Sequence, residues 1–254
     1  MSRISLLPSH LVDQIAAGEV IERPASALKE LVENALDAVA TQIMIDITDG
    51  GVSSIFVSDN GCGMNAEELA LSVKRHATSK LSTANLFEIK SFGFRGEALP
   101  SIAAVSDLEI SSRTEMLDHG WKIRIEHGNI FASEPVACSV GTTVSVKELF
   151  DKIPARRKFL KTQRTESGQC LEVVKQLAMA TPDVSYIFTD TGRTLLNLPA
   201  RTNESSAIRD RLSDVMGHVF AKEAVMLDAQ KNTCSLLGLM GLPTMNRPTT
   251  HCMH

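Results

Sequence analysis

Four polar residues between positions 30 and 37 have the types and spacing that a catalytic site would need. With about 100° of rotation per residue in a helix, Glu30, Glu33, Asn34 and Asp37 lie within about 100° of arc on one face. The face holds three carboxylates and one carboxamide, with no Lys or Arg among them to offset the like charges. Two interpretations follow: a solvated acidic surface, or a site for a divalent cation and for a water molecule that awaits a general base.

A second polar group follows an expected strand at residues 54–58. The segment Asp59-Asn60-Gly61-Cys62-Gly63 places a carboxylate beside two glycines. Asp59 is able to accept a hydrogen bond from a ligand amine, such as the exocyclic amine of adenine. The alternative is an Asx-turn, in which the carboxylate bonds only to its own backbone.

A third feature is a glycine-punctuated loop from 76 to 96 that opens a helix. Glycine lets backbone N–H groups approach a phosphate, and a helix N-terminus adds partial positive charge, which suits Gly96-Glu97-Ala98-Leu99. Thr78, Ser79 and Lys80 add two hydroxyls and one cation. Taken alone, Gly-x-x-Gly is more often only a turn. No G-x-x-x-x-G-K-[ST] run occurs, which excludes an ordinary P-loop NTPase.

The hydrophobic pattern predicts the elements that position these residues. Apolar residues opposite the acidic face predict a helix over 25–39, and the alternation of Ile43, Ile45 and Ile47 predicts a strand with one buried face. The other expected helices are a short one that ends at Ala17 with Gly18 as its stop, and those over 66–75, 97–104 and 166–180. The other expected strands cover 54–58, 107–113, 121–127, 130–134 and 143–147, with turns at 49–51 and 191–192.

Composition describes an ordinary globular protein and excludes several classes of function. A net charge of −4 gives no global attraction to nucleic acid, and 4% aromatic residues argue against a base-stacking single-strand binder. Five scattered cysteines without a C-x-x-C pair predict a reduced, cytoplasmic protein without a cysteine zinc site. Residues 251–254, His-Cys-Met-His, are of types that bind soft metal ions, but we interpret them as a chain end and not as a metal site. No apolar run resembles a signal peptide or is long enough to span a bilayer.

Seven sequence blocks, spread over residues 14–160, together resemble one family. The blocks are 14–26, 29–34, 59–63, 75–80, 93–99, 141–143 and 154–160. They are similar, in content and order, to the N-terminal region of the MutL family of DNA mismatch-repair proteins. That family belongs to an ATPase superfamily with DNA gyrase, a heat-shock chaperone and histidine kinases. The Glu30-x-x-x-Asn34 and Asp59-x-Gly-x-Gly63 patterns are common to the superfamily. Gly-Phe-Arg-Gly-Glu-Ala-Leu at 93–99 and Pro-Ala-Arg-Arg-Lys-Phe-Leu at 154–160 point to MutL.

The resemblance implies a role for each polar group, with ATP and Mg²⁺ as ligands. Glu30 would be the general base that activates water, Asn34 the magnesium ligand, and Asp59 the reader of adenine. Glu33 and Asp37 are assigned to structure. The residues expected to contact the nucleotide or its lid are Asn34, Asp59, Gly63, Thr78, Ser79, Lys80, Gly93, Phe94, Arg95, Gly96, Glu97, Ala98, Leu99 and Thr143.

Partners follow from the same resemblance. It implies a homodimer formed on ATP binding, the mismatch-recognition protein MutS, and a downstream nicking endonuclease or helicase. No membrane contact is implied, and the location would be cytoplasmic, near the nucleoid. The basic stretch Arg156-Arg157-Lys158 would contact DNA phosphates, or would be only a solvated loop.

The expected fold is α+β: a two-layer α/β sandwich with a mixed, largely antiparallel sheet and helices on one face. The ATP-binding domain would cover 1–200, and 201–254 would begin a second, ribosomal-S5-like α/β domain, with the polar segment 199–206 as the boundary. The expected function is the ATPase region of a MutL-like mismatch-repair protein, which hydrolyses ATP slowly. The alternative is an ATP-gated clamp that does not hydrolyse.

The chain departs from the family pattern in three places. Val39 stands where the family commonly has glycine, and Pro100 stands where it usually has alanine. The family's second-domain lysine, which reaches the terminal phosphate, lies beyond this sequence. We therefore expect weak hydrolysis by this chain.

Overall fold

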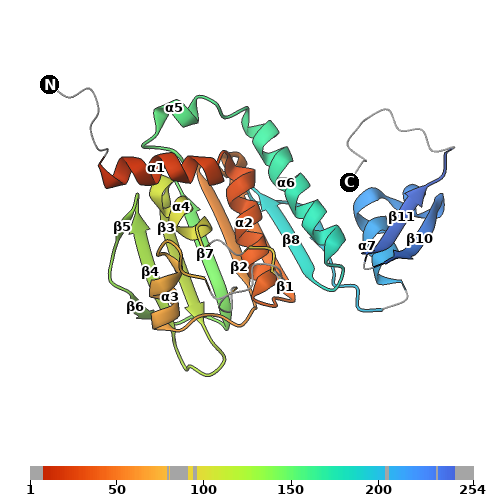
Figure 1. Ribbon diagram of the computed structural model, residues 1–254, viewed down its shortest axis with the longest axis horizontal. Coiled ribbons are helices and arrows are strands. Elements are labelled where there is room, and N and C mark those ends of the chain that lie inside the picture. Colours follow the sequence, from red (N-terminus) through yellow and green to blue (C-terminus); the bar gives the residue numbers. More distant parts are fainter. Residues whose placement is uncertain are drawn as a thin grey trace.

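The computed structural model describes residues 8–78, 80, 91–93, 96–203, 206–232 and 234–243, with the backbone alone for 9–13. Among these residues, no helix is both long enough and apolar enough to cross a membrane. Most of the described chain forms one sheet with helices packed on it, and a smaller unit follows near the C-terminus (Figure 1).

The sheet has nine strands and is mixed, as the sequence predicted. Its order is β5-β4-β3-β7-β2-β1-β8-β9, and β6 pairs with β4. Every neighbouring pair is antiparallel except β1 and β8, which run parallel. The strands are β1 Gln42–Thr48, β2 Ser54–Asp59, β3 Asp107–Arg113, β4 Gly120–Glu126, β5 Asn129–Ile130, β6 Glu134–Val136, β7 Gly141–Lys147, β8 Ser185–Asp190 and β9 Arg193–Leu198.

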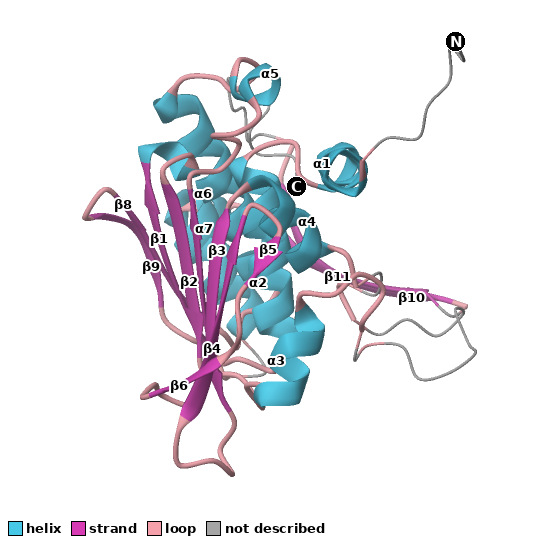
Figure 2. Cartoon of the chain, turned by 90° about the vertical axis from the view of Figure 1, so that its left-hand side faces the viewer, coloured by secondary structure: helices cyan, strands magenta, loops and turns pink. Residues whose placement is uncertain are grey.

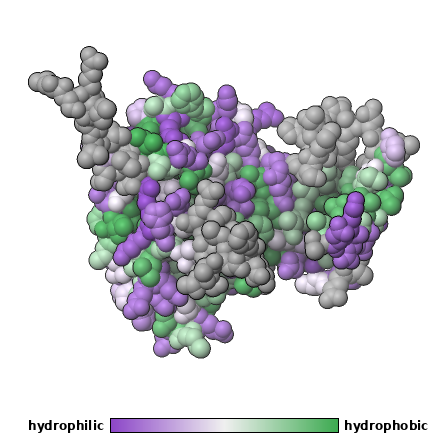
Figure 3. All heavy atoms as spheres, in the orientation of Figure 1, coloured by the Kyte–Doolittle hydropathy of each residue, from purple (hydrophilic) through white to green (hydrophobic). Residues whose placement is uncertain are grey.

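Within the described residues, helices cover one face of this sheet and leave the other face open (Figure 2). On β1, Ile43, Ile45 and Ile47 are buried beneath the helices, whereas Met44 on the open face is 43% exposed. This alternation confirms the predicted α+β sandwich. The helices are α1 Ser9–Val20, α2 Pro24–Asp37, α3 Ala66–Ser72, α4 Ala98–Val105, α5 Pro154–Arg157 and α6 Gln163–Ala180, and a short 3-10 turn, η1, spans Asp49–Gly51. Hydrophilic and hydrophobic residues are interspersed over the face of the molecule seen in Figure 3.

The C-terminal unit contains α7 Ala207–Met216, α8 His218–Lys222 and the hairpin β10 Ala224–Lys231 with β11 Cys234–Gly241. Arg211 attaches α7 to the main sheet. Its guanidinium is buried and donates hydrogen bonds to the carbonyls of Pro182, Val184 and Pro199 at 2.7–3.0 Å. The segment expected to be a domain boundary is thus held at both sides by packing.

Several predicted boundaries differ from the structure, including the following three. Helix α1 continues through Gly18 to Val20, because one glycine inside a helix costs only about 1 kcal/mol. The strand expected over 130–134 is divided: β5 ends at Ile130 and the chain rejoins β4 only at Glu134. Helix α3 ends at Ser72, whose hydroxyl donates to the Leu69 carbonyl and so competes with further helical bonding.

The end of α2 is strained at Val39. This residue has φ +60°, a left-handed conformation in which a β-branched side chain is costly, and its side chain is 81% exposed. Although Val39 replaces the glycine that is common in the family, the backbone here still has the conformation that favours glycine. We expect Val39→Gly to raise the free energy of unfolding by roughly 1 kcal/mol, measured by chemical denaturation. Val39→Ala keeps the Cβ atom, so its free energy of unfolding should rise by less. If the Val39→Gly protein is no more stable than the original, Val39 is not strained.

Candidate nucleotide site

Helix α2 positions the first polar group. Pro24 begins the helix with its φ already set, and the apolar face with Leu28, Leu31 and Val32 is buried in the core. The opposite face therefore looks away from the sheet. Glu30 and Asn34 are both half-buried on that face, one helical turn apart.

No Lys or Arg lies among the four residues of this face, but two lysines from outside it pair with its carboxylates. Lys29 Nζ lies 2.7 Å from Glu33 Oε1, an i,i+4 ion pair that the spacing of the two residues could have predicted. Lys80 Nζ lies 2.6 Å from Asp37 Oδ2. Of the acidic residues on this face, Glu33 and Asp37 thus each have a basic partner.

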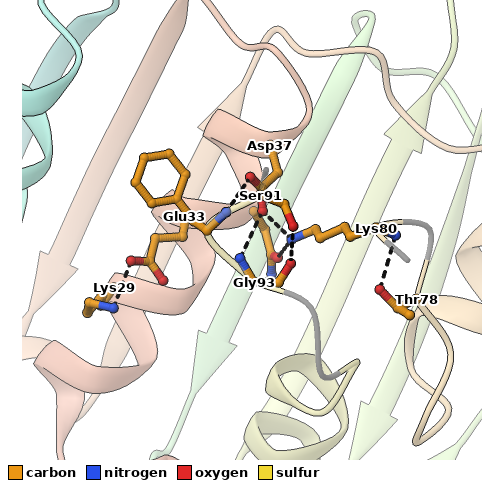
Figure 4. A network of polar contacts seen from close by, with 9 residues as sticks. Lys29, Glu33, Asp37, Thr78, Lys80, Ser91 and Gly93 are labelled. Atoms are coloured by element: carbon orange, nitrogen blue, oxygen red, sulfur yellow. Dashed lines mark hydrogen bonds and ion pairs between the residues drawn. The ribbon is translucent and has the colours of Figure 1, made fainter. Parts of the chain in front are cut away.

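Lys80 also joins the loop to the expected magnesium ligand. Its Nζ donates to Asn34 Oδ1 at 2.7 Å, so one ammonium bridges a carboxamide and a carboxylate one turn apart (Figure 4). Asp37 accepts in addition from the backbone N–H groups of Phe92 at 3.0 Å and Gly93 at 3.3 Å. Asp37 therefore holds residues on both sides of segment 81–90, a positioning role that the sequence pattern did not indicate.

Asp59 ends β2 and turns back on its own loop. Its Oδ1 accepts from the N–H of Gly61 at 2.8 Å and from that of Thr142 at 3.3 Å, so the Asx-turn considered for this residue is present. Burial raises the pKa of the Asp59 carboxyl from 3.8, and the two backbone hydrogen bonds oppose that shift. Because both of these bonds end on Oδ1, Oδ2 is the oxygen that suits a ligand amine.

Two glycines allow the loops to pack closely at this end of the sheet. Gly63 has φ +68°, and a Cβ built there would lie 2.1 Å from the Arg113 carbonyl oxygen. Gly96 has φ +62°, and its Cβ would lie 2.4 Å from the carbonyl oxygen of Ala77. Any other residue at Gly96 would push the 76–78 segment away from the start of α4.

The start of α4 faces that segment. The His76 N–H donates to the Gly96 carbonyl at 3.2 Å, and His76 Nδ1 lies 3.6 Å from Glu97 Oε1. Ala98 and Leu99 form the first turn of α4, and the Leu99 side chain packs on the core, so only its backbone remains for a ligand. The Thr78 hydroxyl accepts from the Lys80 N–H at 3.1 Å. The expected lid residues Ser79, Phe94 and Arg95 lie outside the described part of the chain.

The placement of Thr143 argues against the role expected for it. Thr143 pairs with Ser58 across β2 and β7, and their hydroxyl oxygens lie 2.9 Å apart. It lines a hollow of about 460 Å³ on the open face of the sheet, together with Asp46, Phe56 and Lys147. Side chains alternate along a strand, so Thr143 points away from α2.

Its neighbour Thr142 lies on the helix-covered face instead. Thr142 pairs with Asp59, its N–H donates to Asp59 Oδ1, and its hydroxyl lies 2.9 Å from that of the buried Ser112. Of the two threonines, Thr142 and not Thr143 shares a face with Asp59, because a shift of one residue reverses the face of a strand. Alternation relative to Asp59 would have identified Thr142 if the register of β2 and β7 had been known.

The basic stretch is largely occupied by contacts within the chain. Arg156 Nη1 donates to the carbonyls of Gly18 and Ile21 at 3.0 and 3.2 Å, which caps the end of α1. Arg157 pairs with Asp151 at 2.5 Å. Lys158 is exposed. Two of the three residues expected to contact DNA thus stabilise local structure.

Known proteins match this chain in sequence and in fold. Residues 21–136 match the family described as Histidine kinase-, DNA gyrase B-, and HSP90-like ATPase. The DNA mismatch repair protein MutL of Paramagnetospirillum magneticum is 48% identical over 248 residues, which are 97% of this chain and 41% of that protein. The MutL of Thiobacillus denitrificans is 45% identical over 252 residues, or 99% of this chain and 41% of that protein. The chain thus spans about two fifths of the length of these relatives.

A solved structure matches this chain in fold as well as in sequence. The Aquifex aeolicus MutL ATPase domain complexed with ADP is 33% identical, with a TM-score of 0.67. The similarity covers 83% of this chain and 73% of that one. The fold, the order of the sequence blocks and these relatives agree: the chain belongs to the MutL family of DNA mismatch repair proteins and corresponds to its N-terminal ATPase region.

Proposed function

We propose that this chain binds Mg-ATP between α2, the end of β2 and the start of α4, and hydrolyses it. The observation that carries the proposal is the meeting of three separate segments: Asn34 and Asp37 of α2, Lys80, and Gly93. Asp59 and Thr142 lie at the same end of the sheet as the loop that enters α3. The Aquifex relative with ADP supports a nucleotide as the ligand.

Each residue has a role that suits its surroundings. Asp59 Oδ2 accepts the exocyclic amine of adenine, while Oδ1 stays with Gly61 and Thr142. The N-terminus of α4 faces the phosphates with its free N–H groups. Glu30 takes a proton from the attacking water, since it lies on the same face of α2 as Asn34.

The polar face of α2 fits a magnesium ion. Asn34 Oδ1 already accepts from a cation, the ammonium of Lys80, so the local field favours positive charge at that atom. Bound Mg²⁺ keeps several waters and takes few protein ligands, and it neutralises phosphate charge. Asn34 would hold it, and Lys80 would then leave Asn34 and keep its ion pair with Asp37.

For the whole protein, we propose the role of its relatives in DNA mismatch repair. ATP binding would order the lid and bring two copies together, and the dimer would couple mismatch recognition by MutS to a nicking endonuclease or helicase. DNA contact through the basic stretch would fall mainly to Lys158, because Arg156 and Arg157 have partners within the chain.

Competition between Lys80 and Mg²⁺ at Asn34 gives a test. At fixed ADP, we expect Lys80→Met to lower the half-saturating Mg²⁺ concentration by roughly three- to tenfold, about 0.7–1.4 kcal/mol. Calorimetric titration of Mg²⁺ into protein with ADP measures it. Lys29→Met removes a charge of the same sign from α2 without touching Asn34, and it should leave that concentration unchanged.

The outcomes separate the parts of the proposal. Equal shifts in both lysine variants would mean a general effect of charge, and competition at Asn34 would be wrong. ADP binding that ignores Mg²⁺ in the original protein would remove Asn34 as the metal ligand. A folded chain that binds no ADP at all would remove the nucleotide site.

A further inference from the structure

We propose that Asp107, His127 and Glu148 form a second metal site, for Zn²⁺, at the other end of the sheet. Asp107 is the first residue of β3, His127 follows β4, and Glu148 follows β7. Strand β3 lies between the other two, and Asp107 pairs with Glu126 on one side and with Lys147 on the other. The register therefore brings one ligand from each of three neighbouring strand ends together. One ligand atom of each residue lies within 4.8 Å of the other two.

The geometry of the Asp107–His127 pair supports a shared ion. Asp107 Oδ1 and His127 Nε2 are 3.3 Å apart, whereas a charge-assisted N–H···O bond is about 2.7–2.9 Å long. Asp107 Oδ1 is buried and, within the described residues, has no hydrogen-bond partner. Two ligands of a tetrahedral Zn²⁺, each about 2.0–2.1 Å from the ion, are separated by about 3.3–3.4 Å. The pair is thus spaced like two ligands of one metal, and a cation would satisfy the buried oxygen.

The donor set and its surroundings select the ion. One imidazole with two carboxylates suits Zn²⁺, whereas Mg²⁺ and Ca²⁺ prefer oxygen ligands alone. The His127 side chain is only 7% exposed, and its backbone N–H donates to the Ser106 carbonyl at 3.1 Å, so the ring is held in place. Glu148 is exposed and free to turn its long side chain toward the pair, and water completes the tetrahedron.

The role of such a site is structural. Along β3, Asp107 lies five residues before Ser112, the partner of Thr142, which places it about 17 Å from the nucleotide end of the sheet. Two residues beyond Glu148, the Phe150 N–H donates to the Val105 carbonyl at 2.8 Å, and α5 follows. The ion would link the ends of three strands. It would thereby stabilise the start of the segment that leads to α5, where Arg156 contacts the end of α1.

The experiment uses the full chain, stripped with a chelator and free of nucleotide and Mg²⁺. We expect calorimetry to show that the original chain binds one Zn²⁺. In Glu148→Gln and in His127→Gln, the affinity for this ion should fall by roughly 10–100-fold or more. Zinc at a hundredfold excess over its dissociation constant should raise the melting temperature by about 5–10 °C. Co²⁺ in its place should give the visible absorption of a tetrahedral site.

Controls separate this site from other ligands. His119→Gln removes a histidine from the turn before β4, outside the cluster, and should bind Zn²⁺ as the original does; His251, Cys252 and His254 are common to all variants. Glu148 is exposed, so Glu148→Gln should fold normally, which its metal-free melting temperature checks. Two results would contradict the proposal and leave the cluster as an ion pair. One is that the Glu148 and His127 variants bind Zn²⁺, and shift in melting temperature, in the same way as the original. The other is that the original binds no Zn²⁺.

Discussion

Glu30→Gln should stop ATP turnover and leave ATP binding intact. The substitution keeps the size of the side chain and removes only the carboxylate that would take the proton from water. A positioned general base contributes about 10²–10⁴ in rate, so phosphate release at saturating ATP should fall by that factor. The dissociation constant for ATP should change by less than about threefold, because Glu30 would contact the water and not the nucleotide.

Glu33→Gln is the matched control for this prediction. It removes a carboxylate from the same face of α2, but Glu33 pairs with Lys29 and is assigned a structural role. Turnover should survive in that variant. Intact turnover in Glu30→Gln would exclude Glu30 as the base. If the original chain binds ATP and releases no phosphate, the alternative of a non-hydrolysing clamp describes this region better.

Asp59→Asn should weaken nucleotide binding and stabilise the fold. An Asn in this place still offers an oxygen to the N–H groups of Gly61 and Thr142, but it turns an NH₂ group toward the adenine amine. Loss of a charge-assisted hydrogen bond costs about 1.5–3 kcal/mol, or roughly 10–150-fold in the dissociation constant for ADP. Asp46→Asn, on the open face of β1, should leave ADP affinity unchanged.

The effect of Asp59→Asn on stability depends on pH. Burial raises the pKa of the Asp59 carboxyl above 3.8, so the folded state favours the protonated form. The group thus favours folding most below pH 3.8, and this contribution is lost as pH rises through the folded pKa. At pH 7 the buried charge costs stability, and Asp59→Asn should melt above the original. The gain should shrink toward pH 4, and a gain independent of pH would show that burial of the charge is not its cause.

Local pattern predicted the elements that carry the site. The burial of every second residue in β1 and the two faces of α2 follow from periodicity that needs no partner to be recognised. The identities of Glu30, Asn34 and Asp59 as candidates came from the same local pattern. The Lys29–Glu33 pair is equally local, and its i,i+4 spacing was sufficient to predict it.

Contacts between distant segments could not be predicted in this way. Lys80 meets Asn34 across 46 residues and Arg156 meets Gly18 across 138, and no periodicity encodes either pair. The faces of Thr142 and Thr143 have the same origin, because the register of β2 on β7 decides which of the two shares a face with Asp59. Tertiary pairing, and not residue type, fixed these parts of the site.

The proposed site should bind ADP more tightly than GDP, because Asp59 would accept the amine of adenine. Titration of the chain with each nucleotide in the presence of Mg²⁺ measures the two affinities. Guanine carries a carbonyl where adenine carries its exocyclic amine, so Asp59 Oδ2 would face an acceptor. We expect saturable binding of one ADP per chain, with GDP at least tenfold weaker, about 1.4 kcal/mol. Equal affinity for the two nucleotides, or no saturable binding of ADP by a folded sample, would contradict the proposed site.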